Sequence, residues 1–323
     1  MELRGLGRYR LLDDVSGPSP YARYYTARHE DEPGGTARPE HEPGGEAPGY
    51  LAKLLDAGRG ADAPLRRGQF EHEIRLLKSF NHPCIPTLHA SGDQDGVPYM
   101  VLDRVDGVSL ATLLGHDTGQ PRSITKEIAV YVMGQLVDAL RHVHTLEYLE
   151  AGEPTALGVV HRDLCPRNVW VSRRGDVILY DFMVTTSQWL PAEHDEPAAG
   201  TLAYMAPERL PAGAHANPKT DLFGMASLLW ECLRGERLFQ GADDAATREA
   251  IERFDISQPS RRVSGLSPKL SEIVRKNLDR DPARRYKDAY QMLQRLAQAP
   301  EAKVAEQSRQ ALAALVTQAV PTS

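Results

Sequence analysis

Apolar residues recur with two different spacings along the chain, which divide it into a strand-rich early part and a helix-rich later part. Three short runs of aromatic and aliphatic residues are typical of β-strands, and they span residues 21–27, 50–55 and 97–105. Between the second and third runs, Phe70, Ile74 and Leu77 recur at helical spacing. The sequence Asn81-His82-Pro83 would end that helix. We therefore expect a small sheet with one helix near the N-terminus.

The later part carries mainly the helical pattern. One helix is expected after the candidate caps Ser123 and Thr125, with an apolar face made of Ile128, Val132, Leu136, Leu140 and Val143. Further helices are expected to begin near Lys219, Ser267 and Asp288. Two β-rich runs, 168–172 and 177–180, flank the turn 173–175. In the tail, helical spacing is shown by Leu312, Leu315, Val316 and Ala319. The whole pattern indicates an α+β protein.

One stretch, from His29 to Gly49, interrupts this pattern between two expected strands. It holds five Gly and four Pro and nearly repeats itself, and its five Glu and one Asp face a single Arg. Such a composition buries too little apolar surface to offset the entropy lost on ordering. We expect a disordered acidic insertion, with a short docking segment for a partner as the alternative.

The composition excludes several classes of protein. The chain has 323 residues, is 41% hydrophobic and 25% charged, and carries a net charge of -6. These values fit a globular chain rather than a disordered or collagen-like one. Without a basic balance or a Lys/Arg stripe, nucleic acid is not expected as a partner. No apolar run approaches the roughly 20 residues of a membrane-spanning helix, so no membrane insertion is expected.

The cysteines indicate a reducing compartment. Cys84, Cys165 and Cys232 are odd in number and widely spaced, and they form no Cys-x-x-Cys pair. This pattern favours neither a disulfide framework nor a zinc site. We therefore expect the protein to be cytoplasmic.

The strongest chemical signal is the order of three motifs. His161-Arg162-Asp163-Leu164-Cys165-Pro166-Arg167-Asn168 is followed by Asp181-Phe182-Met183 and then by Ala206-Pro207-Glu208. Each motif alone is weak, because an isolated His-Arg-Asp is usually a solvated charge cluster. Together they resemble the catalytic loop, metal-binding triplet and substrate-loop anchor of the protein kinase family. Upstream, Lys53 and Glu73 stand where that family places a strand lysine and a partner glutamate on helix αC.

The resemblance implies a role for each of these residues in phosphoryl transfer from ATP. Lys53, paired with Glu73, would contact the α- and β-phosphates. Asp163 would accept the proton of the attacking hydroxyl. Asn168 and Asp181 would hold Mg²⁺, or Mn²⁺ in its place, through hard oxygen ligands.

Other positions extend the resemblance. Leu102 would be the gatekeeper, and the backbone of Asp103 to Val105 would be the hinge that binds adenine. Glu208 and Arg285 would form a buried ion pair, and Asp221 would steady the catalytic loop. The peptide-substrate loop Gly200 to Glu208 favours a kinase of protein serine and threonine over one of small molecules. Thr185, Thr186 and Ser187 are each candidates for a phosphorylation site facing Arg162.

The implied fold is bilobal. A small β-rich N-lobe with the αC helix would span residues 8–105, with the insertion at 29–49. A larger helical C-lobe would span residues 106–297, and a short helical or disordered tail would span 298–323.

Three departures weaken the match. The loop expected to cover the phosphates reads Val15-Ser16-Gly17-Pro18-Ser19-Pro20, so Gly17 alone remains, and each proline lacks a backbone N–H. Cys165 replaces a lysine and would have a redox role only if it were reactive. Met183 replaces a glycine.

These features define two readings of the function. The first is a bacterial-type, eukaryotic-like serine/threonine protein kinase that acts on ATP and an unidentified protein substrate and also autophosphorylates. The alternative is a pseudokinase that binds nucleotide and regulates or scaffolds a partner.

Overall fold

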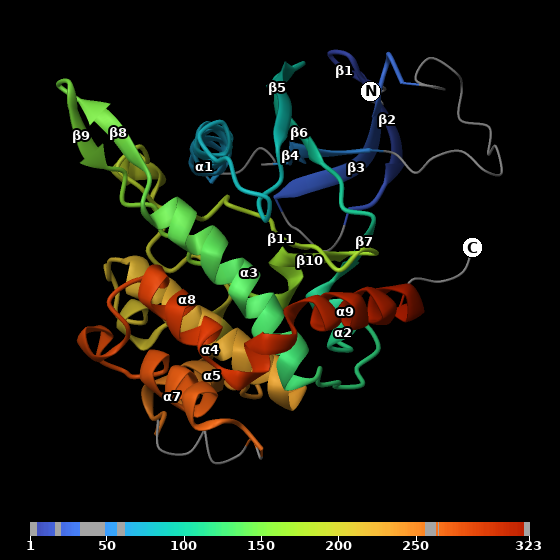
Figure 1. The fold of residues 1–323 in the computed structure, drawn as a ribbon. Helices are drawn as coiled ribbons and strands as arrows, with labels where there is room; N and C mark the ends of the chain where they lie inside the picture. The colour runs from blue at the N-terminus through green and yellow to red at the C-terminus, as the bar shows by residue number, and fades with distance from the viewer. Residues whose placement is uncertain are drawn as a thin grey trace. The chain divides into compact units, whose positions relative to one another are not determined.

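A computed structural model describes residues 5–16, 21–32, 49–56, 62–255, 263 and 265–319. The chain divides into two compact units. The small unit comprises Met1–Asn81, Pro86–Asp106 and Leu190–Asp195, and the large unit comprises His82–Ile85, Gly107–Trp189 and Glu196–Ser323. The early part is rich in β-structure and the later part is helical, which confirms the expected α+β fold (Figure 1). Gly17 and most of the stretch 29–49 lie outside the described residues.

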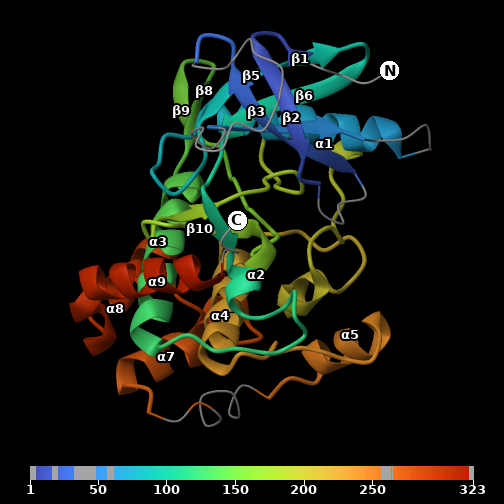
Figure 2. The ribbon, with the colours of Figure 1, turned by 90° about the vertical axis from the view of Figure 1, so that its right-hand side faces the viewer.

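The small unit is built on a six-stranded antiparallel sheet in the order β1-β2-β3-β4-β6-β5. Its strands are β1 Gly5–Leu6, β2 Tyr9–Asp14, β3 Ala22–His29, β4 Tyr50–Leu55, β5 Leu88–Gln94 and β6 Val97–Asp103. Helix α1, Ala63–Leu77, lies along one face of this sheet (Figure 2). All three predicted strands and the predicted helix are therefore present.

The alternation of side chains in the strands forms the apolar cluster of the small unit. Its buried members are Leu6, Ala27, Ala52, Leu54, Tyr99 and Val101. Ala52 and Leu54 flank Lys53 in β4, so Lys53 points to the opposite face of the sheet. In register, Lys53 lies between Tyr24 of β3 and Met100 of β6.

The large unit is organised around one long helix. Helix α3, Lys126–His144, packs against α4, α8 and α9 (Figure 1). Within the described residues, its further α-helices are α2 Leu110–Leu113, α4 Pro218–Arg234, α5 Asp244–Glu252, α7 Pro268–Asn277, α8 Ala289–Ala297 and α9 Ala305–Ala319. Several helices begin at caps that the sequence indicates, since the side chains of Thr125, Ser267 and Asp288 each accept a backbone N–H bond.

Short strands complete the large unit. Strands β7 Gly107–Ser109, β10 Val169–Ser172 and β11 Val177–Leu179 form one sheet in the order β11-β10-β7. Strands β8 Glu147–Glu150 and β9 Glu153–Ala156 form a separate hairpin. The sequence pattern predicted β10 and β11 but missed this hairpin.

The tail forms a helix that is part of the large unit's core. In α9, Leu312 and Val316 are fully buried, and the helix contacts α3, α2, β7 and β10. Arg309 pairs with Asp176 at 3.1 Å. The apolar residues at helical spacing in the tail therefore mark the face by which α9 packs against the rest of the large unit.

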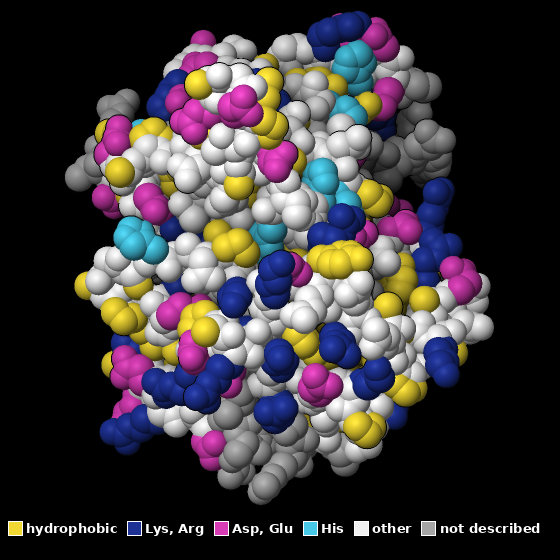
Figure 3. All heavy atoms as spheres, turned by 60° about the vertical axis from the view of Figure 1, so that its left-hand side comes forward, with side chains coloured by type: hydrophobic (Ala, Val, Ile, Leu, Met, Phe, Trp, Pro, Cys, Tyr) yellow, Lys and Arg dark blue, Asp and Glu magenta, His cyan; other side chains and the backbone are white. Residues whose placement is uncertain are grey.

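The surface is mixed in character. On the face shown in Figure 3, Lys and Arg side chains alternate with acidic and uncharged ones rather than forming one continuous basic surface. Across the described ranges, no helix combines the length and apolar character needed to cross a bilayer.

Candidate active site

The small unit brings Lys53 and Glu73 together. The Nζ atom of Lys53 lies 3.0 Å from Oε1 and 2.7 Å from Oε2 of Glu73. Both side chains are only 2% exposed. A buried charge is costly unless it is paired and hydrogen-bonded, so each of these two groups depends on the other. The predicted contact between the strand lysine and the helix glutamate is confirmed.

The large unit fixes Asp163 through donors from two other positions in the chain. Asn168 donates from Nδ2 to the Asp163 carbonyl oxygen and to Oδ2, each at 2.8 Å. The backbone N–H of Thr201 donates to Oδ1 at 2.7 Å. Because both carboxylate oxygens accept bonds from fixed donors, the carboxylate has a set orientation. The structure thus brings Asp163 and Asn168 together.

Asp221 anchors the backbone of the catalytic loop. Its carboxylate is buried and accepts the N–H groups of His161 and Arg162, each at 2.9 Å, and Nε2 of His144 at 2.7 Å. Burial alone would raise the pKa of Asp221, but these donors hold the pKa below its usual value. The predicted role of Asp221 in steadying the loop is confirmed.

His161 supports the loop from inside. It is fully buried, it accepts the N–H of Asp163 at Nδ1 at 3.2 Å, and its ring packs on Phe182. Burial lowers its pKa.

Two non-glycine residues of the site adopt left-handed backbone conformations. Arg162 has φ of 71° and Asp181 has φ of 63°. Such conformations cost energy in L-residues and persist where the surroundings impose them, which is common at functional sites. Asp181 follows β11, and the N–H of the preceding Tyr180 donates to the carbonyl of Asn168 at 2.8 Å. Asn168 and Asp181, the two expected metal ligands, therefore lie on stretches of chain that this backbone hydrogen bond joins.

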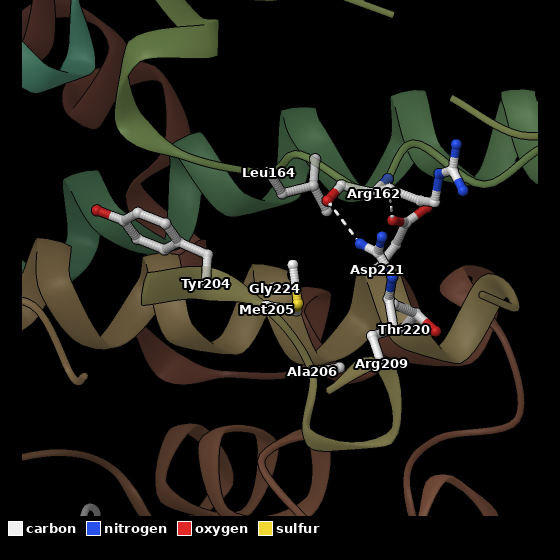
Figure 4. A pocket seen from close by; sticks show the side chains of 9 residues that line it. All are labelled: Arg162, Leu164, Tyr204, Met205, Ala206, Arg209, Thr220, Asp221 and Gly224. Carbon is white, nitrogen blue, oxygen red and sulfur yellow. Dashed lines mark hydrogen bonds between the residues drawn. The ribbon is translucent and has the colours of Figure 1, made fainter. Parts of the chain in front are cut away.

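Arg209 links the catalytic loop to the segment before the substrate loop, and the sequence analysis missed it. Arg209 is 2% exposed. Nη1 donates to the carbonyl of Arg162 at 3.2 Å, and Nη2 donates to the carbonyls of Pro197 and Ala199 at 2.7 and 2.6 Å. Figure 4 shows Arg209 and Arg162 lining one pocket with Asp221.

The Glu208–Arg285 ion pair is confirmed. Arg285 donates from Nη1 and Nη2 to the two Glu208 oxygens at 2.7 and 2.6 Å. It also donates to the carbonyls of Asp279 and Lys219. This bidentate pair fixes the end of the substrate loop to the segment between α7 and α8 that carries Arg285.

The segment after Asp181 corrects one expectation. Thr185 is fully buried and donates to the carbonyl of His161, so its hydroxyl is not accessible to a kinase. Thr186 pairs with Val160 in an isolated β-bridge. Arg162 donates from Nε to the carbonyl of Val184 at 2.5 Å. Two side-chain hydrogen bonds to backbone carbonyls and one β-bridge therefore hold this stretch against the loop that carries His161 and Arg162.

Cys165 does not behave as a reactive thiol. Its side chain is 2% exposed, and burial raises its pKa to about 12. Reactive cysteines have a depressed pKa and solvent access. The structure thus argues against the redox role.

The predicted adenine-binding residues lie at the end of β6. Leu102 is buried, and the N–H of Asp103 donates to the carbonyl of Thr87 at 3.1 Å. The Asp103 carboxylate accepts the N–H of Thr87 and contacts His89. The N–H of Asp103 is therefore already hydrogen-bonded within the protein. Val105 is half-buried in the loop that follows β6.

Ser16, next to Gly17, takes part in the sheet. Its hydroxyl accepts the N–H of Tyr24 at 2.8 Å and donates to the carbonyl of Tyr24. The residue thus extends the pairing of β2 with β3 through its side chain.

Comparisons with known proteins agree with this arrangement. The serine/threonine-protein kinase PknL of Mycobacterium tuberculosis (strain H37Rv) is 30% identical over 243 residues, covering 74% of this chain and 56% of that protein. The serine/threonine-protein kinase PknB of Mycolicibacterium smegmatis is 28% identical over 231 residues, covering 69% of this chain and 34% of that protein. The chain thus spans between about a third and just over half of these relatives.

A family match covers most of the chain. Residues 58–296 match the family described as the protein kinase domain. The match includes Glu73 and the whole catalytic loop, whereas Lys53 precedes it. Because it covers well over half of the 323 residues, the chain belongs to the protein kinase domain family.

Proposed function

We propose that the chain is a serine/threonine protein kinase that transfers the γ-phosphate of ATP to protein hydroxyls and also phosphorylates itself. The observation that carries this proposal is the fixed carboxylate of Asp163, which accepts bonds from Asn168 and Thr201. Phosphoryl transfer depends mainly on positioning and electrostatics, and a base held on both oxygens meets that need.

Asp163 is the proposed general base. It accepts the proton of the substrate hydroxyl while the hydroxyl oxygen bonds to the γ-phosphorus and the bond from that phosphorus to the leaving oxygen of ADP breaks. Both Asp163 oxygens already accept one hydrogen bond each, and a carboxylate oxygen has a second lone pair for the substrate. The base therefore needs no rearrangement to receive the proton.

Members of this family generally use ATP and Mg²⁺. The donor set here fits that ion, because Asn168 directs its amide nitrogen at Asp163, which leaves its amide oxygen, alongside the carboxylate of Asp181, as a hard ligand. Bound Mg²⁺, or Mn²⁺, would neutralise charge on the β- and γ-phosphates. Asn168 and Asp181 are the proposed ligands.

The proposed nucleotide contacts come from the small unit. Lys53, paired with Glu73, would bind the α- and β-phosphates. The backbone around Asp103 and Val105 would bind adenine beside Leu102, and Gly17 would approach the phosphates.

Two further parts of the proposal concern the class of substrate and the location of the protein in the cell. We propose a protein substrate rather than a small molecule because Arg209 and the Glu208–Arg285 pair fix a peptide-substrate loop in place. A cytoplasmic location is supported by the three cysteines, which are free thiols.

The pseudokinase alternative rests on the altered loop around Gly17, on Cys165 and on Met183. It has less support than catalysis because both carboxylate oxygens of Asp163 and both of Asp221 accept hydrogen bonds from fixed donors. A scaffold has no need of a base held on both oxygens.

The test is phosphate transfer from labelled ATP, with Mg²⁺ or Mn²⁺, to the protein itself and to a generic basic protein. Asp163→Asn keeps the size of the side chain and should lower transfer by about 10²–10⁴-fold. Asp176→Asn, which alters a half-exposed carboxylate paired with Arg309, is the matched control and should leave transfer nearly unchanged. Binding of Mg-ATP without transfer by the wild type would support the pseudokinase instead.

A further inference from the structure

A short piece of the segment between Asp181 and Glu208 packs on helix α1. Residues Leu190–Asp195 belong to the small unit, and the 3₁₀-helix Ala192–His194 within them contacts α1. The ring of His194 lies over Gly68. A Cβ atom added at Gly68 would come within 2.3 Å of Cδ2 of His194, a distance that real Cβ atoms essentially never show. The close approach therefore requires glycine.

This glycine is otherwise unfavourable where it stands. Gly68 lies inside α1, where glycine stabilises a helix less than alanine does. The absence of a side chain at this point thus serves the contact with His194 and not the helix itself.

Gln69 fixes the same contact by hydrogen bonding. Its Nε2 atom donates to the carbonyl of His194 at 3.2 Å, and its Oε1 atom accepts Nη1 of Arg66 at 2.9 Å. Gln69 is fully buried. The guanidinium of Arg66 lies 4.0 Å from the centre of the Tyr21 ring. The nitrogen and the oxygen of the Gln69 amide are thus each held by a hydrogen bond.

The contact lies on the part of α1 that presents Glu73. Gln69 and Glu73 are four residues apart and therefore neighbours on one face of the helix. Both are buried. A shift or rotation of α1 that broke the contact with His194 would also move Glu73 relative to Lys53.

We propose that His194 is a positioning residue, which docks residues 190–195 into the socket formed by Gly68 and Gln69 and so holds Glu73 against Lys53. The catalytic consequence rests on the proposed kinase function, whereas the docking itself does not.

Gly68→Ala tests the socket, and Gly134→Ala is its matched control. Gly134 is a glycine inside α3 with no atom within 4 Å of an added Cβ. Alanine favours a helix more than glycine does at both positions. If the contact with His194 did not matter, neither substitution would therefore harm the protein. We expect Gly68→Ala alone to raise hydrogen exchange in residues 188–198 by about tenfold, since the undocked segment opens more often.

Turnover provides a second measurement. Gly68→Ala should lower kcat by about tenfold or more, with little change in the KM for the protein substrate, because misplacement of Glu73 affects the reacting groups. His194→Ala alone should lower kcat as well, and adding it to Gly68→Ala should lower kcat little further, because both changes remove the same contact. Fully additive losses would mean that Gly68→Ala acts on α1 by another route.

The outcomes separate the two proposals. Equal hydrogen exchange in the Gly68→Ala and Gly134→Ala proteins would overturn the docking, whatever the activity. Raised exchange in Gly68→Ala with unchanged kcat would overturn the positioning role. If the wild type transfers no phosphate, the kinase function fails, and the exchange comparison still decides whether His194 docks.

Discussion

The small and large units hold their proposed site residues in different ways. In the large unit, Asp163 and Asp221 each accept several hydrogen bonds from separate stretches of chain. In the small unit, the proposed phosphate contact depends on one ion pair between β4 and α1. The loop that would cover the phosphates contains two prolines.

The difference teaches where this kinase domain tolerates change. The residues proposed to act on the substrate hydroxyl are held by several hydrogen bonds, whereas the proposed phosphate contact, Lys53, is paired with a glutamate on one helix, α1. We therefore expect substitutions in the small unit to alter nucleotide use strongly and those in the large unit to alter turnover.

The largest effect is expected at Lys53. Lys53→Met should abolish transfer and, because it removes the cation that pairs with the buried Glu73 carboxylate, should lower the free energy of unfolding by about 3–5 kcal/mol. Urea unfolding measures this loss. Lys53→Met combined with Glu73→Gln should regain most of the stability and none of the activity. Full activity in Lys53→Met would contradict the proposed role.

Arg209 tests the large unit. Arg209→Met removes the bonds to the carbonyls of Pro197 and Ala199, just before the Thr201 N–H that orients Asp163. We expect kcat to fall by about 10–100-fold while the KM for ATP changes little. Arg248→Met is the control, since Arg248 is exposed and bonds one carbonyl, that of Leu210. An equal fall in both variants would sink the idea that Arg209 acts through Asp163.

A substitution in the loop expected to cover the phosphates should have a smaller effect, and it should strengthen nucleotide binding rather than weaken function. Pro18→Gly supplies a backbone N–H, and one added hydrogen bond of about 1 kcal/mol corresponds to roughly fivefold tighter Mg-ATP. The dissociation constant, measured by calorimetry, should fall, whereas Pro39→Gly should leave it unchanged. Ser16 is kept because its hydroxyl pairs β2 with β3. Unchanged affinity would mean that this loop does not reach the phosphates.

The smallest expected effect is on the stability of the protein at acidic pH. Burial lowers the pKa of His161, and also that of His142, below the ordinary 6.5. The unfolded chain therefore binds more protons than the native one once the pH falls below 6.5, so stability drops in that direction. Each histidine contributes a slope of at most about 1.4 kcal/mol per pH unit. His161→Gln should reduce the slope measured by urea unfolding between pH 6.5 and 5; an unaltered slope would contradict this assignment.

Local patterns made much of the fold predictable. The strands β3, β4 and β6 and the capped helices α3, α7 and α8 follow from periodicity and cap residues. Strand β5, which pairs with β6, and the hairpin β8–β9 were missed because these strands are short or polar. Their turns did carry a signal, since Asp95-Gly96 and Ala151-Gly152 each supply two residues with positive φ.

The site was predictable where its residues form motifs. Asp163, Asn168 and Asp181 stand in recognisable order, and the pairing of Lys53 with Glu73 followed from the resemblance. Arg209 and His194 could not be found in this way, because their partners are set by tertiary contact; Gln69 and His194 are 125 residues apart. No local pattern encodes such a contact.

Helix α9 determines where the folded domain ends. The family match stops at residue 296, yet Leu312 and Val316 of α9 are fully buried. A Cβ atom at Gly175 would lie 2.3 Å from the backbone of Arg309, so the turn between β10 and β11 is shaped to receive this helix. A protein shortened to the family boundary would expose the apolar face that α9 covers, and the smallest piece expected to fold cleanly therefore extends through Ala319.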